Sequence, residues 1–323
     1  MKLDWRLVLV MVLSLGLMVS CESTDDEETA ATAFETLSKY MVDNDMDATT
    51  VVAGWTIGAS TLSGNEANYF VVDIRSADVY ATGHIPGAVN CARTDILTTV
   101  EDGNTNNLPV VVTCYSGQSA TLAVVALRLS GYTDAKSLLW GMSGWATQFD
   151  SWSSKVDSVA KGNTNWVTTA APTHLSGNAE PEIVTEYTDG SAILAERVEL
   201  MLASTKSVAG ADVLAAPENY EIINFWGATD YDHYGHIAGA YQVTPDPNEL
   251  TIANDGLDIL DPAQTIVTYC WTGQTSGMVT SWLRVLGYDA TSLSNGANSM
   301  IYHKLEGHKW GALATSYDME TGL

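Results

Sequence analysis

Two segments of the chain repeat one arrangement of residue types. Pro109–Ser119 and Thr265–Thr275 each contain a β-branched run, a cysteine, a short loop with a central glycine, and the start of a helical pattern. The β-branched runs predict buried strands, which place Cys114 and Cys270 at strand carboxyl ends. At such a junction, successive N–H groups and the positive end of a helix converge on one point. This arrangement predicts two cysteines of lowered pKa, each able to hold an anionic sulfur or oxygen group.

The elements around the two cysteines also recur in the same order. Strands are expected over 69–74 and 220–225, helices over 120–130 and 277–286, and a last strand over 137–139. First helices are expected over 34–46 and 197–204, and a closing turn and helix over 141–152. This alternation predicts an α/β protein of two domains, each a mainly parallel sheet flanked by helices on both faces. The chemistry is then expected in the loops at the strand carboxyl ends.

Composition divides the chain further. Residues 159–182 are rich in Thr, Asn, Ala, Gly and Ser, which predicts a linker between domains at 33–158 and 183–323. Residues 1–20 combine an early positive charge with a short apolar run, which predicts a signal peptide that is too short to favour a membrane-spanning helix.

The segment Met18–Cys21 resembles a bacterial lipobox, which makes Cys21 the expected site of lipid attachment. The acidic residues of 21–32 then form a tether. This interpretation predicts a lipoprotein anchored at the bacterial cell envelope, in the outer membrane by resemblance to the usual sorting pattern. An ordinary secretory signal with an incidental cysteine is the alternative.

The chain carries 39 acidic and 14 basic side chains, for a formal charge of −25. Nucleic acids and anionic lipid headgroups are poor partners for such a chain, because phosphates are bound through clustered Lys and Arg. The same field slows the capture of small dianions, unless loop amides and helix ends compensate for it locally.

Several motifs together resemble the rhodanese pattern over residues 50–155. They are Asp73-Ile74-Arg75, Gly83–Asn90, the Cys114–Ser119 loop and Gly141–Trp145. The second half keeps Gly235–Ala240 and the Cys270–Thr275 loop, but has Asn224 and Trp226 where Asp and Arg are expected. On these residues the chain is identified as a tandem rhodanese-like protein.

The resemblance implies a rhodanese-type sulfurtransferase. Sulfane sulfur would pass from a small sulfur-containing donor to Cys114 or Cys270 as a persulfide, and then to a thiol or another nucleophilic acceptor, with no cofactor. The substrate-binding residues would be those of the two loops: Tyr115, Ser116, Gly117, Gln118 and Ser119 in the first, and Trp271, Thr272, Gly273, Gln274 and Thr275 in the second. Their amides would form the cradle, the glycines would allow the tight turn, and Ser119 and Thr275 would add hydroxyl donors.

Two departures from the family pattern limit this interpretation, and the first is that both loops carry a cysteine, whereas familiar two-domain members keep one only in the second loop. Many thiosulfate-using members carry basic residues in the loop, whereas Tyr115-Ser116 and Trp271-Thr272 are neutral, so the donor stays open. Related cysteine phosphatases close the loop with an arginine where this chain has Ala120 and Ser276, which argues against phosphoryl chemistry.

Other candidate residues are interpreted as structural. Asp73 and Arg75 are expected to form a scaffold ion pair, and His84 and His236 to be satisfied by local backbone. His233 with His236, and His303 with His308, could be drawn as metal pairs, but the sequence offers no third and fourth ligands, so no metal site is expected.

Two further functions stay open. A loop cysteine could cycle with Cys91 or a partner thiol in a redox protein. Alternatively, the fold could serve as a non-catalytic binding subunit of an outer-membrane assembly with an envelope protein partner.

Overall fold

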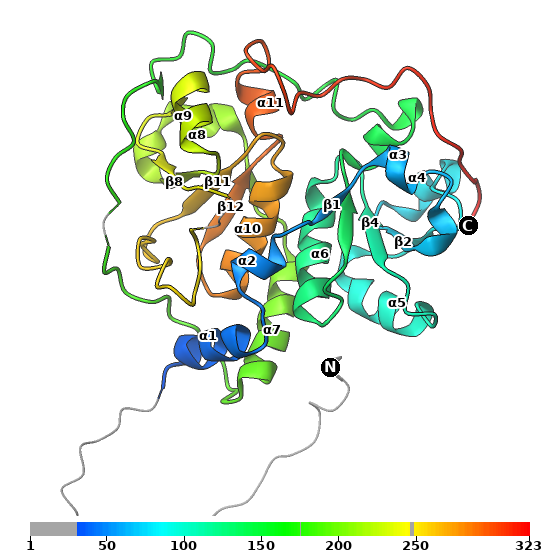
Figure 1. Ribbon diagram of the computed structural model, residues 1–323, viewed down its shortest axis with the longest axis horizontal. Helices are drawn as coiled ribbons and strands as arrows, with labels where there is room; N and C mark the ends of the chain where they lie inside the picture. Colours follow the sequence, from blue (N-terminus) through cyan, green and yellow to red (C-terminus); the bar gives the residue numbers. More distant parts are fainter. Residues whose placement is uncertain (1–30, 175, 246–248) are drawn as a thin grey trace, which may run out of the picture.

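The computed structural model describes residues 31–174, 176–245 and 249–323. The expected signal peptide, Cys21 and nearly all of the acidic tether lie outside these residues. The described chain forms two five-stranded sheets that lie on either side of a central layer of helices (Figure 1).

The first sheet is entirely parallel, with the strand order β1-β5-β4-β2-β3. Its strands are β1 (Thr56–Ile57), β2 (Phe70–Asp73), β3 (Val89–Asn90), β4 (Val110–Thr113) and β5 (Lys136–Leu138). The central strand β4 is buried at every position, which is why its sequence is a continuous β-branched run rather than an alternating one.

The second sheet repeats this topology, with the order β10-β8-β11-β12-β7 and only parallel pairs. Its strands are β7 (Ser207–Val208), β8 (Glu221–Asn224), β10 (Tyr241–Gln242), β11 (Ile266–Tyr269) and β12 (Ala290–Leu293). The predicted fold of two parallel α/β domains is therefore confirmed, and β11 occupies the place that β4 has in the first sheet.

Helices follow most of the strands. They are α1 (Ala33–Asp43), α2 (Ala48–Val51), α3 (Ala59–Leu62), α4 (Ala77–Thr82), α5 (Ile96–Gly103) and α6 (Gln118–Leu129) in the first half, and α7 (Gly190–Ala203), α8 (Gly210–Ala215), α9 (Ala228–Tyr234), α10 (Gln274–Val285) and α11 (Ala297–Met300) in the second. None of the helices in the described part of the chain is both long and apolar enough to cross a membrane.

The core consists of three hydrophobic clusters, because each sheet is covered on both faces. Val110 and Val112 of β4 and Ile266 of β11 belong to one large cluster between the sheets, into which α6 and α10 pack. Val111 faces the opposite side, toward the outer cluster of the first domain, and Val267 faces the outer cluster of the second. The period-two alternation of a strand thus divides neighbouring valines between separate cores.

The two ends of the described chain cross to the opposite domain. Helix α1 packs on α7 of the second half, and Trp282 of α10 donates from Nε1 to the Met46 carbonyl at 3.0 Å. The segment that follows α11 runs back over the first domain (Figure 1), where the Tyr317 amide donates to the Trp145 carbonyl at 3.0 Å. Each sheet is therefore covered partly by residues that come from the other end of the chain.

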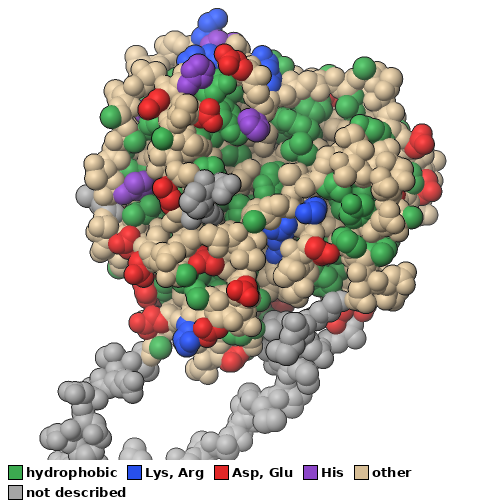
Figure 2. All heavy atoms as spheres, in the orientation of Figure 1, with side chains coloured by type: hydrophobic (Ala, Val, Ile, Leu, Met, Phe, Trp, Pro, Cys, Tyr) green, Lys and Arg blue, Asp and Glu red, His purple; other side chains and the backbone are tan. Residues whose placement is uncertain are grey.

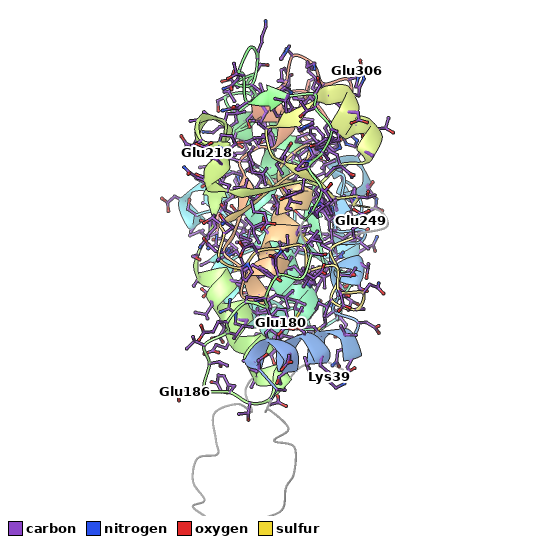
Figure 3. The ribbon with its side chains drawn as sticks, turned by 90° about the vertical axis from the view of Figure 1, so that its left-hand side faces the viewer. Lys39, Glu180, Glu186, Glu218, Glu249 and Glu306 are labelled. Carbon is purple, nitrogen blue, oxygen red and sulfur yellow. The ribbon has the colours of Figure 1, made fainter. Side chains whose placement is uncertain are left out.

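Charged side chains lie mainly at the periphery. In Figure 3, Lys39 and Glu186 lie at one end of the molecule and Glu306 at the other, while the central helices lie inside. On the face drawn in Figure 2, Asp and Glu side chains are scattered widely, and Lys and Arg form small groups. This distribution matches the strongly negative charge of the sequence.

Two details differ from the expectations. The closing turn and helix predicted over 141–152 are found only as two short 3-10 helices, Gly141–Gly144 and Thr147–Phe149, and no α-helix forms because this segment is hydrogen-bonded to the cysteine loop. The segment between the domains contains a strand, β6 (Trp166–Val167), which pairs antiparallel with β9 (His236–Ile237).

Candidate active site

Cys114 directly follows β4, where its strand meets α6. Its side chain is 3% exposed, and its Sγ accepts a hydrogen bond from the Gly117 amide at 3.1 Å. Gly117 has a φ of 86°, a left-handed conformation that favours glycine and turns the chain tightly back over the sulfur. The sequence prediction of a cysteine below a glycine-centred loop therefore agrees with this geometry.

The orientation of the loop amides depends on a second segment, residues 141–152. The Met142 amide donates to the Cys114 carbonyl at 2.8 Å, and the Ser143 hydroxyl donates to the Tyr115 carbonyl at 2.9 Å. The Trp152 indole donates to the Ser116 carbonyl at 3.0 Å. Because three successive carbonyls are held on this outer side, their neighbouring N–H groups are free to turn toward the sulfur.

Burial and the amides act on Cys114 in opposite directions. Burial raises the pKa of the Cys114 thiol, and this effect outweighs the amides. The opposing amides belong to Ala120, Ser116, Gly117 and Ser119. The expectation of a lowered pKa is therefore wrong for Cys114, since the desolvation of a 3% exposed sulfur exceeds the stabilisation that the amides give to the thiolate.

Sequence reasoning also missed an arginine near this cysteine. Burial lowers the pKa of Arg93, and the negative charge of the Cys114 thiolate acts against that change, so the guanidinium lies within electrostatic reach of the sulfur. Its Nε and Nη2 donate to the Leu202 carbonyl of the second domain, at 3.0 and 2.8 Å. Arg93 lies in the short 3-10 turn Arg93–Asp95 that follows β3, and it therefore joins the first domain to the second.

Cys270 occupies the corresponding position after β11, where the hydrogen bond from a loop amide to its sulfur is longer than the one at Cys114. It is 2% exposed, and its Sγ accepts a hydrogen bond from the Ser276 amide at 3.3 Å. Trp271 stacks between Trp226, with ring centroids 4.2 Å apart, and His308, at 5.3 Å. The mouth of the second loop is thus packed with aromatic rings, whereas Tyr115 at the same position of the first loop is 43% exposed.

The two cysteine loops interlock across the domain boundary. Gln274 of the second loop accepts at Oε1 from the Trp140 amide at 3.3 Å, and Gln118 of the first accepts at Oε1 from the Asn295 amide at 3.3 Å. A Cβ added at Gly117 would lie 2.0 Å from Gln274 Nε2, and one at Gly273 would lie 2.2 Å from Gln118 Nε2. Each loop glycine therefore makes room for the glutamine side chain of the opposite loop.

The remaining loop residues differ in how far they are buried. Thr272 is buried and its hydroxyl accepts from the Gln274 amide at 3.2 Å, while Ser116, Ser119 and Thr275 are half-buried. A cavity of about 560 Å³ opens at the first loop, lined among others by Tyr115, Ser116 and Gln118. The first loop thus borders an open space at Tyr115, Ser116 and Gln118.

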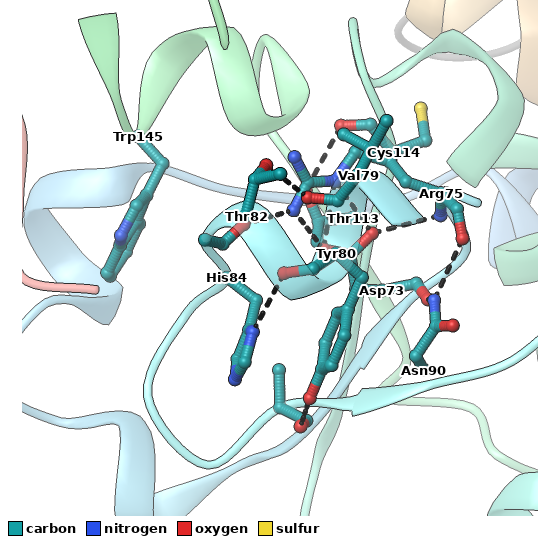
Figure 4. A network of polar contacts seen from close by, with 12 residues as sticks. Asp73, Arg75, Val79, Tyr80, Thr82, His84, Asn90, Thr113, Cys114 and Trp145 are labelled. Carbon is teal, nitrogen blue, oxygen red and sulfur yellow. Dashed lines mark hydrogen bonds and ion pairs between the residues drawn. The ribbon is translucent and has the colours of Figure 1, made fainter. Parts of the chain in front are cut away.

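Asp73 and Arg75 form a fully buried ion pair beside the strand that ends at Cys114 (Figure 4). Arg75 Nη2 lies 2.6 Å from Asp73 Oδ2 and donates to the Gly83 carbonyl at 2.7 Å. In the second domain Trp226 replaces Arg75, and it packs against Trp271 and Tyr269 instead. The second domain therefore exchanges a charged network for an aromatic cluster.

The two histidines lie against this scaffold. His84 stacks on Tyr80 at 3.8 Å, and its Nδ1 lies 3.0 Å from the Tyr80 carbonyl oxygen. His236 stacks on Tyr231 at 3.6 Å, and its burial lowers its pKa. Neither contact places an imidazole on a cysteine sulfur.

Cys91 follows β3 and is half-buried, and burial raises the pKa of its thiol. Cys91, Cys114 and Cys270 are all free thiols in the described part of the chain. Cys21 lies outside the described residues.

Fold and site together define a tandem parallel α/β protein that presents a cysteine at the same strand end of each half. A family model described as the rhodanese-like domain matches residues 59–148 and 211–301, which is more than half of the chain. The chain belongs to the rhodanese-like family, with two such domains.

Individual proteins resemble parts of the chain. The thiosulfate sulfurtransferase GlpE of Pseudomonas fluorescens (strain SBW25) is 36% identical over 84 residues, which cover 26% of this chain and 76% of that protein. The crystal structure of thiosulfate sulfurtransferase from Pseudomonas aeruginosa is 17% identical, with a TM-score of 0.28, over 80% of this chain and 46% of the other. The 3-mercaptopyruvate sulfurtransferase from Leishmania major is 14% identical, with a TM-score of 0.28, over 75% and 72%.

Proposed function

We propose that this protein is a sulfurtransferase that passes sulfane sulfur from a donor to a thiophilic acceptor through a persulfide on Cys114. The observation that carries the proposal is the Gly117 amide, which donates to Cys114 Sγ at 3.1 Å at a strand–loop–helix junction. Membership of the rhodanese-like family supports it, and so does the similarity to GlpE of Pseudomonas fluorescens, which is named as a thiosulfate sulfurtransferase.

The reaction has two half-reactions. The Cys114 thiol first loses its proton to solvent, and the thiolate attacks the outer sulfur of the donor. A new S–S bond forms on Cys114 while the bond between that sulfur and the donor breaks, and the leaving group departs with the electron pair. The acceptor then attacks the outer sulfur, and the electrons of the S–S bond return to Cys114 Sγ. The loop amides hold the anionic sulfur in both steps.

The two cysteines are assigned different roles. Cys114 lies below an exposed tyrosine, Tyr115, which lines an open cavity of about 560 Å³ together with Ser116 and Gln118, and Arg93 is within electrostatic reach of Cys114. Cys270 lies below Trp271, whose ring is stacked on both sides. We therefore assign the main turnover to Cys114 and a slower or secondary reaction to Cys270.

Mass spectrometry of the purified protein after incubation with thiosulfate, mercaptopyruvate or polysulfide tests this function. The expected result is a gain of one sulfur atom on Cys114, absent from Cys114→Ser and retained in Cys91→Ser, with less modification of Cys270. A reversible disulfide between Cys91 and Cys114 would instead indicate a thiol redox protein. No modification with any donor would indicate a binding module.

The cell envelope is the proposed location, on the strength of the apolar segment of residues 7–19 and the lipobox-like Met18–Cys21. Metabolic labelling with a radioactive fatty acid tests the anchor. Label should enter the protein in a bacterial host and be lost in Cys21→Ala. Equal labelling of both would refute lipid attachment at Cys21.

A further inference from the structure

A second, smaller cavity lies between the two domains and reaches both cysteine loops. Its volume is about 190 Å³, and its lining includes Ser116 of the first loop and Gly273 of the second. The cavity is rich in hydroxyl groups from both domains, including those of Ser119, Thr205, Ser207 and Ser294. No Asp or Glu is among the described residues that line it.

Two cations line the same cavity, Lys206 before β7 and Arg284 near the end of α10. Arg284 is only 7% exposed, and its Nη1 and Nη2 donate to the Ser204 carbonyl at 3.0 Å and the Ser204 hydroxyl at 2.7 Å. Lys206 is exposed and forms an ion pair with Asp289. The buried guanidinium thus has oxygen partners on a single residue and no ion pair within the described chain.

The repeat supplies an internal comparison for Arg284. Arg128 holds the same position in α6, where it donates to the carbonyl oxygens of five residues: Thr50, Val51, Ala53, Gly54 and Ala135. All three guanidinium nitrogens of Arg128 thus have carbonyl partners in its own domain, whereas Arg284 makes one bond from Nη1 and one from Nη2, which leaves donors to spare among its five N–H groups. A shared scaffold role explains the position of both arginines, but it leaves the spare donors of Arg284 beside the cavity unexplained.

Two more arginines gather near this point. Arg93 donates to the Leu202 carbonyl, and Arg197 donates to the carbonyls of Val285 and Arg284, at 3.0 and 2.7 Å. Burial lowers the pKa of Arg284, and the charges of Arg93 and Arg197 lower it further.

The nearby carboxylates do not offset this charge fully. Asp289 pairs with Lys206 and also acts on Arg284, and Glu196 acts on Arg197, so two carboxylates face four cations. Four of the 14 basic residues therefore concentrate at one place in a chain of net charge −25. Crowded cations that are held by carbonyl oxygens are stabilised when an anion joins them.

We propose that this interdomain cavity binds a small inorganic oxyanion of the sulfate type, held by Lys206, Arg284 and the hydroxyls of Ser116 and Ser119. Hydroxyl and guanidinium donors match the several acceptor oxygens of such an anion. A volume of about 190 Å³ accommodates a tetrahedral oxyanion with a few waters. The second domain would thus bring to the first loop the basic groups that Tyr115-Ser116 lack.

Calorimetric titration of the full chain with sodium sulfate tests the site, with sodium chloride at equal ionic strength as the reference. Saturable binding of sulfate alone is expected, and Lys206→Gln should weaken it about tenfold, because one charge-assisted contact is lost. Lys136→Gln is the matched control, since this exposed lysine donates to the Gly54 carbonyl in the equivalent region of the first domain.

Three results would overturn the proposal: no saturable sulfate binding, equal binding of chloride, or an equal effect of Lys206→Gln and Lys136→Gln. Because Arg284 is buried and its removal risks unfolding, Ser119→Ala provides the second variant, with an expected loss of about threefold in affinity.

Binding of sulfate does not rest on the proposed sulfur transfer. Cys114→Ser should bind sulfate normally, so a failure of persulfide formation and a failure of anion binding are separate results. If the parent protein turns over thiosulfate, sulfate that raises KM without changing kcat assigns the cavity to the oxyanion group of the donor. A change in kcat assigns it to a separate effector anion.

Discussion

Gly141 lies beneath the first cysteine loop, and its replacement by alanine should disturb the site from below. Gly141 has a φ of 58°, and a Cβ built there would lie 2.4 Å from the Gly117 nitrogen and 2.5 Å from the Cys114 carbonyl oxygen. Both atoms belong to backbone, so no flexible side chain can move aside. The second domain repeats this contact at Gly296, where a Cβ would lie 2.3 Å from the Cys270 carbonyl oxygen.

The cost of Gly141→Ala has two parts. The left-handed conformation costs an alanine about 1 kcal/mol. The overlap with the loop backbone adds about 1 to 3 kcal/mol, as for other overpacked sites. The free energy of unfolding should therefore fall by about 2 to 4 kcal/mol. If the loop moves to relieve the overlap, the Gly117 amide leaves Cys114 Sγ, and the pKa of the thiol should rise further because the thiolate loses a hydrogen-bond donor.

Urea unfolding measures the first effect, and the pH dependence of alkylation of Cys114, in a protein that also carries Cys91→Ser and Cys270→Ser, measures the second. Gly87→Ala is the matched control, because Gly87 has a φ of 72° but no atom within 4 Å of the added Cβ. The control should lose only about 1 kcal/mol and keep the Cys114 pKa. If the two variants lose equal stability and titrate alike, the close contact below the loop has no role.

Two further predictions concern stability. Burial, followed by the charge of Asp261, raises the pKa of Glu221 to about 7, so the folded state holds this proton more tightly and stability should fall as the pH rises from about 4.5 to 7. Glu221→Gln should therefore be about 1 to 2 kcal/mol more stable than the parent at pH 8, after allowance for solvent screening, and equal to it near pH 4.5; thermal melts in which the difference is independent of pH would contradict this. Deletion of 316–323 should lower the free energy of unfolding by about 3 kcal/mol through lost main-chain bonds, whereas deletion of Leu323 alone, which is 95% exposed, should not. Equal urea midpoints for the two deletions would show that the segment contributes nothing.

The sheets and the cysteine loops could be predicted from the sequence because their signals are local. The runs at Val110–Thr113 and Ile266–Tyr269 are β-branched and continuous, since both faces of these strands are buried. The glycines of the two loops have positive φ, as their position between strand and helix predicts. The long helices that follow were also predicted, with boundaries within a few residues.

The contacts between the domains could not be predicted. The exchange of Gln118 and Gln274 between loops, and the bonds from Arg93 to the Leu202 carbonyl, depend on how the two domains pack, which no local pattern encodes. The lowered pKa expected for Cys114 failed for the same kind of reason. The amides were predicted correctly, but the burial that outweighs them arises only in the packed tertiary structure.

The chain crosses between its halves at both ends, and this has a consequence during synthesis. Trp145, in the first domain, accepts a hydrogen bond from the Tyr317 amide and donates one to the Asp318 carbonyl. Both partners follow the whole second domain in the sequence. A ribosome releases those residues only after it has made both sheets. The amino-terminal half therefore reaches its final packing only after the whole second domain has been made, and until then its outer face stays open to chaperones.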